Sequence, residues 1–74
     1  MKKNDWTPVQ KQVWGKIRYY QYIKDIPDTE LAKTMDVAVR TLKDYDNAPR
    51  TLSLEKINGF LYVHNLPLRE LLGI

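Results

Sequence analysis

The sequence predicts an all-α fold, in which one compact domain of five short helices spans residues 1–74. Three observations support this prediction. Apolar residues recur three and four positions apart in successive stretches, which places them on one face of each helix. Prolines and capping residues separate these stretches by only a few positions, as in compact helical domains. Between residues 28 and 46, a small residue and a sharp turn join two such stretches and predict a helix-turn-helix.

The composition allows one small core. A chain of 74 residues hides only about 60% of its unfolded surface on folding, so its stability margin is narrow. With 43% hydrophobic residues and eight aromatic ones, it fills a core rather than staying disordered. The lack of cysteine excludes disulfides and thiolate metal sites and suits a reducing cytoplasm. No apolar run approaches the ~20 residues of a membrane span and no signal peptide is recognisable, so we expect a soluble, cytoplasmic protein.

The first helix is expected to run from a capping box to about Ile23. Thr7 is the expected N-cap, Pro8 the first-turn proline and Gln10 the reciprocal partner. The expected inward stripe is Val9, Val13, Ile17 and Tyr20, with Trp14 beside it. Gly15 costs about 1 kcal/mol relative to Ala, which is tolerable if another helix approaches closely there. The tyrosines at positions 19, 20 and 22 are either partly buried or form a protein-contact surface.

Residues 28–45 have the pattern of a helix, a sharp turn and a second helix. The positions expected to face a shared core are Leu31, Ala32, Met35, Val37, Leu42 and Tyr45. Ala32 is informative because a larger side chain beside a helix crossing would push the two helices apart. The turn is expected at Asp36, since Asp tolerates positive φ better than most residues other than glycine. The second helix is expected from about Ala38 to Asp46, ending before Asn47-Ala48-Pro49.

Two further helices complete the domain. Ser53 is expected to cap a helix that ends at Asn65, ahead of Leu66-Pro67. Its inward residues are expected to be Leu54, Ile57, Phe60, Leu61 and Val63. A last short helix is expected to contain Leu68, Leu71 and Leu72, before Gly73. These leucines, with Leu66 and Ile74, either close the core over the first helix or supply a dimer seam.

On these motifs, residues 28–72 resemble the Cro and repressor class of helix-turn-helix domains, the XRE family, including the run Leu52-Ser53-Leu54-Glu55-Lys56-Ile57. The resemblance implies a five-helix lambda-repressor-like fold with the helix-turn-helix at about 28–46, and residues 1–6 are expected to form a flexible N-terminal arm. The short chain, its Trp6-Thr7-Pro8 opening and its tyrosine-rich first helix also resemble the modulator-of-repression proteins of temperate-phage genetic switches. That resemblance implies an antirepressor or corepressor acting with the phage repressor in the bacterial host cell.

In the XRE family the second helix of the motif enters the major groove of DNA, which implies a binding role for six positions here. They are Ala38, Val39, Arg40, Thr41, Lys43 and Asp44. Arg40 can donate two hydrogen bonds to guanine, and Val39 can contact a thymine methyl group. Supporting contacts from the preceding helix and the following loop are expected at Asp28, Thr29, Lys33 and Arg50. Without the motif, a solvated helix face is the simpler interpretation of Arg40 and Lys43.

The charge pattern argues for a protein partner. A net charge of +3 favours polyanions only mildly. Asp44 and Asp46 offset Arg40 and Lys43, so this helix carries no net charge, which is unusual for an element that displaces counterions from DNA. Small apolar contacts with paired charges suit a protein surface. We therefore expect a transcription regulator of a lysis–lysogeny switch that binds the phage repressor, with operator DNA as a further partner. The alternative is an autonomous Cro-type repressor that binds operator DNA as a homodimer.

The residue inventory does not favour an enzyme. With one His, one Ser and no Cys, the chain has too few suitable residues for a hydrolase triad. His64 is expected on the surface or as a capping residue. The aspartates at positions 25, 28, 44 and 46 lack the loop spacing of a calcium site and have no histidine partner. There is no glycine-rich phosphate loop. We expect no catalytic residue, metal, cofactor, membrane contact or small-molecule substrate.

Overall fold

The computed structural model describes residues 9–72, and its regular elements there are all helical, which confirms the predicted all-α class. The five helices are α1 (Val9–Ile23), α2 (Asp28–Met35), α3 (Val39–Asn47), α4 (Leu54–His64) and α5 (Leu68–Leu72). A short 3-10 turn, η1 (Pro49–Thr51), lies between α3 and α4 and was not predicted. The expectations for Thr7, Pro8, the arm at 1–6, Gly73 and Ile74 lie outside the described residues.

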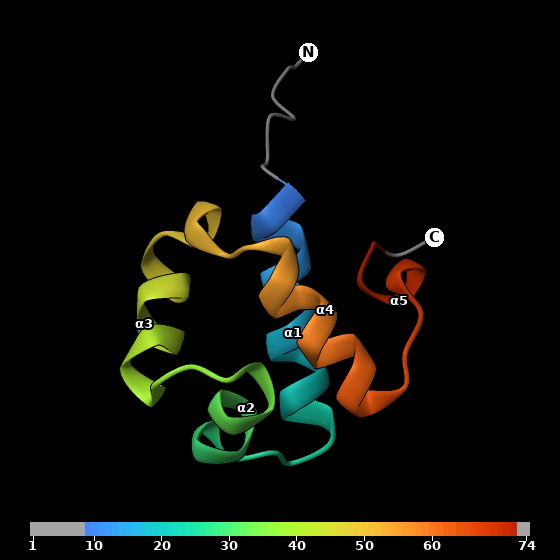
Figure 1. Ribbon diagram of the computed structural model, residues 1–74, viewed down its shortest axis with the longest axis horizontal. Coiled ribbons are helices and arrows are strands. Elements are labelled where there is room, and N and C mark those ends of the chain that lie inside the picture. The colour runs from blue at the N-terminus through green and yellow to red at the C-terminus, as the bar shows by residue number, and fades with distance from the viewer. Residues whose placement is uncertain (1–8, 73–74) are drawn as a thin grey trace.

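Helix α1 occupies the middle of the molecule, and the other helices surround it (Figure 1). Helices α2 and α3 pack against each other on one side, and α4 packs against α2. Helix α5 packs against α1 on the side opposite to α3 (Figure 1). The α2–α3 pair and the α1–α5 pair therefore present two separate surfaces.

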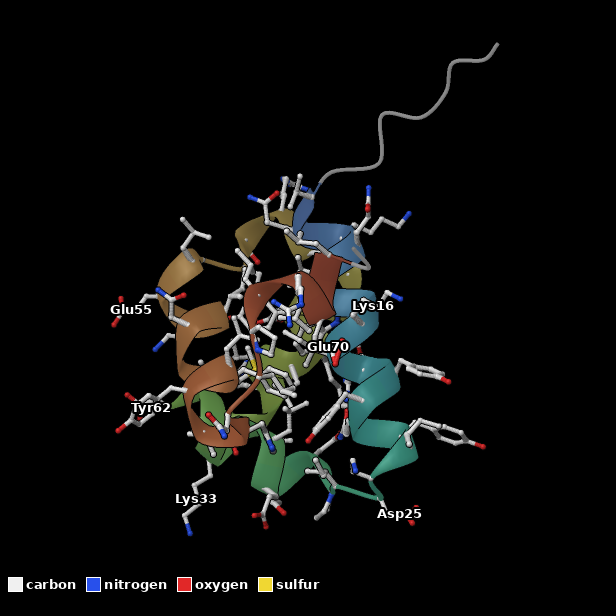
Figure 2. The ribbon with its side chains drawn as sticks, turned by 90° about the vertical axis from the view of Figure 1, so that its right-hand side faces the viewer. Lys16, Asp25, Lys33, Glu55, Tyr62 and Glu70 are labelled. Atoms are coloured by element: carbon white, nitrogen blue, oxygen red, sulfur yellow. The ribbon has the colours of Figure 1, made fainter. Side chains whose placement is uncertain are left out.

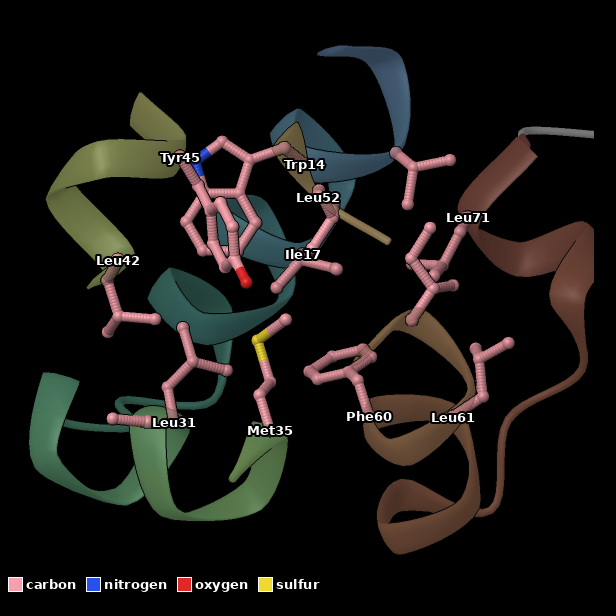
Figure 3. Packing of buried hydrophobic residues seen from close by; sticks show 13 residues of the cluster. Trp14, Ile17, Leu31, Met35, Leu42, Tyr45, Leu52, Phe60, Leu61 and Leu71 are labelled. Carbon is pink, nitrogen blue, oxygen red and sulfur yellow. The ribbon is translucent and has the colours of Figure 1, made fainter. Parts of the chain in front are cut away.

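One cluster of thirteen buried apolar side chains holds the helices together (Figure 3). Its largest fully buried members are Phe60, Ile17, Leu31, Met35, Leu42 and Val13. The rings of Trp14 on α1 and Tyr45 on α3 meet edge to face with centroids 5.1 Å apart. Full burial of one such side chain contributes about 1.5–3 kcal/mol, so this cluster is the main source of stability. Leu71 on α5 belongs to it, which confirms that the last helix closes the core over α1.

Several apolar residues expected on inward faces are exposed instead. They are Val9, Leu54, Val63 and Leu68. Val9, Leu54 and Leu68 each begin a helix, where the chain has not yet reached the core, and Val63 lies in the last turn of α4. Trp14, expected beside the stripe of α1, is in contrast buried. The buried side chains of α1 and α4 begin further along each helix, at Val13 and Ile57.

Three helices end in the same turn. Asp25, Asp36 and Asn65 take the left-handed conformation with φ of 56°, 59° and 55°. At each, the next amide N–H donates to a carbonyl five residues back, as in the bond from Val37 to Ala32 of 2.9 Å. The residues that follow, Ile26, Val37 and Leu66, pack against the core. Asp36 confirms the predicted turn and Asn65 the predicted helix end, whereas the turn at Asp25 was not predicted.

His64, expected on the surface or as a capping residue, is half-buried in the last turn of α4. Its ring packs against Phe60 and Tyr20, with centroids 4.7 Å and 5.1 Å away. Its Nε2 atom is buried and has no hydrogen-bond partner. Burial lowers the pKa of His64 below its ordinary value of 6.5, because the charged form would lose solvation. The side chain therefore acts as part of the aromatic packing between α1 and α4.

Gly15 has open space where a side chain would be. A Cβ added at this exposed position would meet no atom within 4 Å, so the expectation that another helix approaches closely there was wrong. We expect Gly15→Ala to raise the free energy of unfolding by about 1 kcal/mol, because Ala restricts the unfolded chain and favours helix. Urea unfolding followed by circular dichroism measures the change.

A glycine in a different environment provides the contrast for this variant. A Cβ at Gly59, in α4, would lie 3.7 Å from the carbonyl oxygen of Thr34, so Gly59→Ala is expected to give the same gain or a smaller one. A loss of stability in Gly15→Ala would contradict the open space found around this position.

The turn at Asp36 gives a second prediction. We expect Asp36→Val to lower the free energy of unfolding by about 1–2 kcal/mol, because a β-branched residue is strained at φ of 59°. Asp36→Gly should stay within about 1 kcal/mol of the natural protein, since glycine accepts this conformation. Lys33→Val, at an exposed helical position of α2, is the matched control. Equal losses in Asp36→Val and Lys33→Val, measured by thermal unfolding, would contradict the strained turn.

Candidate functional site

The candidate site is the outward face of α3, which the turn after α2 sets at the edge of the molecule. Asp36 ends α2 in the left-handed conformation, and Ala38 is extended with φ of −75° and ψ of 154° before α3 begins. Lys56 on α4 donates from Nζ to the carbonyl oxygen of Asp36, 3.2 Å away, and so ties the turn to α4. Ala32 is buried, as expected for a small residue beside the crossing of α2 and α3.

Helix α3 has one buried and one exposed face. Leu42 and Tyr45 point into the core. Five of the six residues assigned to binding are exposed: Ala38, Val39, Arg40, Lys43 and Asp44. We call these five residues the α3 surface. Thr41, the sixth, is half-buried. The structure therefore brings the expected binding residues together on one accessible helix face.

The expected supporting residues are more scattered. Thr29 and Lys33 are exposed on α2, and Arg50 is exposed in η1. Asp28 differs, because it is half-buried and other side chains donate hydrogen bonds to its carboxylate. The residue that holds it is Arg18 on α1, which the sequence analysis did not single out.

Arg18 joins three helices through one guanidinium group. Its Nε and Nη2 atoms donate to the two carboxylate oxygens of Asp46 at 3.1 Å and 2.8 Å, a paired geometry at the end of α3. Its Nη1 donates to Oδ1 of Asp28, 2.9 Å away at the start of α2. The guanidinium also lies 5.1 Å from the centre of the Trp14 ring. One side chain of α1 thereby fixes both outer ends of the helix-turn-helix.

Two further side chains of α1 complete this network. Trp14 donates from its indole N–H to Oδ1 of Asp46 at 2.7 Å. Gln21, which is buried, donates to Oδ1 of Asp28 at 2.7 Å and accepts from Arg18 at 2.7 Å. Residues 14, 18 and 21 are spaced by four and three, so they share one face of α1. That spacing was the available sequence signal, but nothing local pointed to the two aspartates.

The network shifts the acidity of both aspartates in the same direction. Hydrogen bonds from Gln21 and then Arg18 lower the pKa of Asp28 below its ordinary value of 3.8. The hydrogen bond from Arg18, followed by that from Trp14, lowers the pKa of Asp46. The bond to Asp46 is the largest of the effects that raise the pKa of Arg18. All three groups therefore stay charged near neutral pH.

This pairing adds to the charge balance expected for α3. Arg18 pairs with both Asp46 and Asp28, so its single positive charge offsets only one of the two carboxylates. On the α3 surface, Arg40 and Lys43 accompany one carboxylate, that of Asp44. Lys43 is also close enough to lower the pKa of Asp28 and Asp46 by its charge. The exposed face is therefore mildly basic, with Val39 and Ala38 supplying apolar contact area.

The described residues contain neither a cluster of metal ligands nor a helix that could cross a membrane. Among residues 9–72, no group of three or more His, Cys, Asp or Glu side chains is arranged to hold a metal ion. No helix within the same range is long and apolar enough to cross a membrane. Comparisons with protein-family models, curated proteins and solved structures found no match to this chain.

The Arg18 network predicts a pH-dependent contribution to stability. We expect Arg18→Met to lower the free energy of unfolding by about 1–2 kcal/mol at neutral pH, because it keeps the apolar stem but leaves both aspartates without a cation. Since the pKa values of Asp28 and Asp46 are lowered by folding, the stabilisation is present above pH 3.8 and is lost as pH falls through their folded pKa values. The difference between variant and natural protein should therefore shrink in strong acid.

Urea unfolding at a series of pH values measures this difference. Protonation of His64 also destabilises the fold, but it acts at higher pH, as pH falls through and below 6.5, and affects both proteins equally. Lys11→Met is the control, because it removes the same charge from an exposed position of α1. A difference that stays constant down to strong acid would contradict the role given to the two carboxylates.

Proposed function

We propose that this protein is a small helix-turn-helix regulator of a phage-type genetic switch, and that it acts by binding the switch repressor through the α3 surface. The proposal draws on the resemblance of residues 28–72 to Cro and repressor domains and of the whole chain to modulators of repression. The structural observation that supports it is the exposure of Val39, Arg40, Lys43 and Asp44 on one helix face.

The chemistry of the α3 surface suits a protein partner. A repressor reads DNA with a face rich in Lys and Arg, and the Asp44 carboxylate offers a complementary charge to such a face. Arg40 and Lys43 require carboxylates or carbonyl groups on the partner. Val39 and Ala38 provide the small apolar contacts that exclude water between the charged pairs. Binding of this kind either masks the DNA-reading face of the repressor or joins both proteins on the operator.

A second candidate function is autonomous, Cro-type operator binding. The pairing of Asp28 and Asp46 with Arg18 favours it, because one guanidinium offsets part of the charge of two carboxylates that would repel phosphate. In this case Arg40 reads guanine and Lys43 contacts the DNA backbone. A homodimer is then required, since one small domain contacts too few base pairs.

Asp44 provides a charge test that separates the two functions. If the α3 surface binds the basic face of a repressor, Asp44→Lys should weaken the complex by about tenfold or more, because it places like charges together. If the α3 surface binds DNA directly, the same change should strengthen binding and steepen its salt dependence, because it adds a phosphate contact. Mobility shifts of operator DNA, with the repressor present and absent, measure both effects.

Two further variants complete the test. Arg40→Ala should weaken binding in either case, whereas Lys11→Ala, at an exposed cation of α1, should not. An unchanged mobility of the repressor–operator complex when this protein is added would contradict the primary proposal. Absence of any binding to operator DNA alone would contradict the second.

A further inference from the structure

An apolar groove lies between α1 and α5, on the side of the molecule opposite to α3 (Figure 1). We call it the α1–α5 groove, and its volume is about 270 Å³. Lys16, Tyr19 and Ile23 form the α1 wall, and Glu70 and Leu71 lie on the α5 wall. Leu71 belongs to the buried core, so the core is already closed on this side of the molecule.

Large apolar side chains remain exposed along the groove. On α1, Tyr19 and Ile23 are 64% and 53% exposed. On α5, Leu68 and Leu72 are exposed as well. Single exposed apolar residues are normal, but a set that borders a groove is typical of an interaction surface. A partner that covered the groove would remove this apolar area from water.

Gly15 leaves a gap in the outer face of α1 beside the groove. It precedes Lys16 and lies one turn before Tyr19, and a Cβ added there would meet no atom within 4 Å. No other part of this domain therefore requires a glycine at this helical position, although glycine weakens a helix relative to alanine. A helix position without a side chain lets the backbone of a second helix approach closely. The helix of a partner protein would thus explain a residue that the fold does not.

The charge of the two walls defines the chemistry of the partner. Helix α1 contains no Asp or Glu, and all its charged residues are Lys or Arg. The ion pairs within residues 9–72 are those of Arg18, so Lys16 pairs with no described carboxylate. Figure 2 looks toward the α5 side and shows Lys16 on α1 and Glu70 on α5. A partner complements the groove if its carboxylates lie toward α1 and its other edge, toward Glu70, is not acidic.

An amphipathic helix combines these properties. Such a helix places a row of large apolar side chains in a groove and keeps its charged side chains at the edges. Its backbone would cross α1 at Gly15, and its apolar residues would contact Tyr19 and Ile23. A single-stranded nucleic acid could stack a base on Tyr19, but the walls are mainly apolar and Glu70 would repel phosphate.

We propose that the α1–α5 groove binds an acidic, amphipathic helix of a partner protein, which crosses α1 at Gly15 and pairs a carboxylate with Lys16. The groove shares no residue with the α3 surface and lies on the opposite side of the molecule. The protein therefore holds one partner on each side and links them. This inference does not depend on which macromolecule the α3 surface binds.

Two synthetic helical peptides of about 18 residues, or five turns, test the groove. Both carry leucines spaced three and four positions apart, and beside this stripe one has glutamates where the other has lysines. NMR titration of the full, isotope-labelled chain measures both dissociation constants and maps the site. The acidic peptide should bind about tenfold more tightly than the basic one, or better, with shifts at Tyr19 and Ile23. Lys16→Glu should abolish this preference.

Gly15→Leu separates binding from folding. Leucine favours a helix over glycine and meets open space, so urea unfolding should show a variant at least as stable as the natural protein. It should still weaken binding of the acidic peptide by about tenfold or more, because the leucine holds the two helices apart. Asn58→Leu adds the same side chain at an exposed position of α4 outside the groove, and it should leave binding unchanged.

Four results would overturn the proposal. They are no binding of the acidic peptide at millimolar concentration, equal affinity for the two peptides, shifts that map outside the groove, and an affinity that Gly15→Leu leaves unchanged. Two further measurements address other occupants. Tighter binding of a thymidine oligonucleotide would assign the groove to nucleic acid instead, and self-association of the natural protein that Gly15→Leu abolishes would assign it to a second copy.

Discussion

The structure depends on the sharing of one small core by helices that are too short to be stable alone. Helix α2 has eight residues and α5 has five, well below the length at which an isolated helix persists in water. Each helix therefore forms only because it contributes side chains to the thirteen-residue cluster. The same constraint explains why the residues that begin the helices, such as Val9 and Leu54, stay exposed.

Arg18 adds a polar connection that the core alone does not provide. It links α1 to the first residue of α2 and to the last turn of α3, and so sets the two outer ends of the helix-turn-helix. It also affects the charge that α3 shows to a partner, because its positive charge offsets one of the two carboxylates, Asp46 and Asp28, with which it pairs. Stability and the electrostatics of the candidate site thus rest on the same guanidinium group.

The arrangement leaves two chemically different surfaces on opposite sides of α1. The α3 surface is mildly basic and has small apolar residues, which suits a charged macromolecule. The α1–α5 groove is mainly apolar, with one charge of each sign at Lys16 and Glu70. The two surfaces share no residue.

The sequence by itself determined the features that arise within a few residues of one another. Ser53 as a cap, Asp36 as a left-handed turn, Asn65 as a helix end and the exposed outer face of α3 were predictable, since caps and helical spacing are local signals. Only the tertiary structure decided the partners of Arg18, which lie 10 and 28 positions away, and the packing of His64 on Tyr20. It also decided where the α1–α5 groove lies. Burial and pairing depend on how the helices cross, and the spacing of residues along one helix does not show which helix lies opposite.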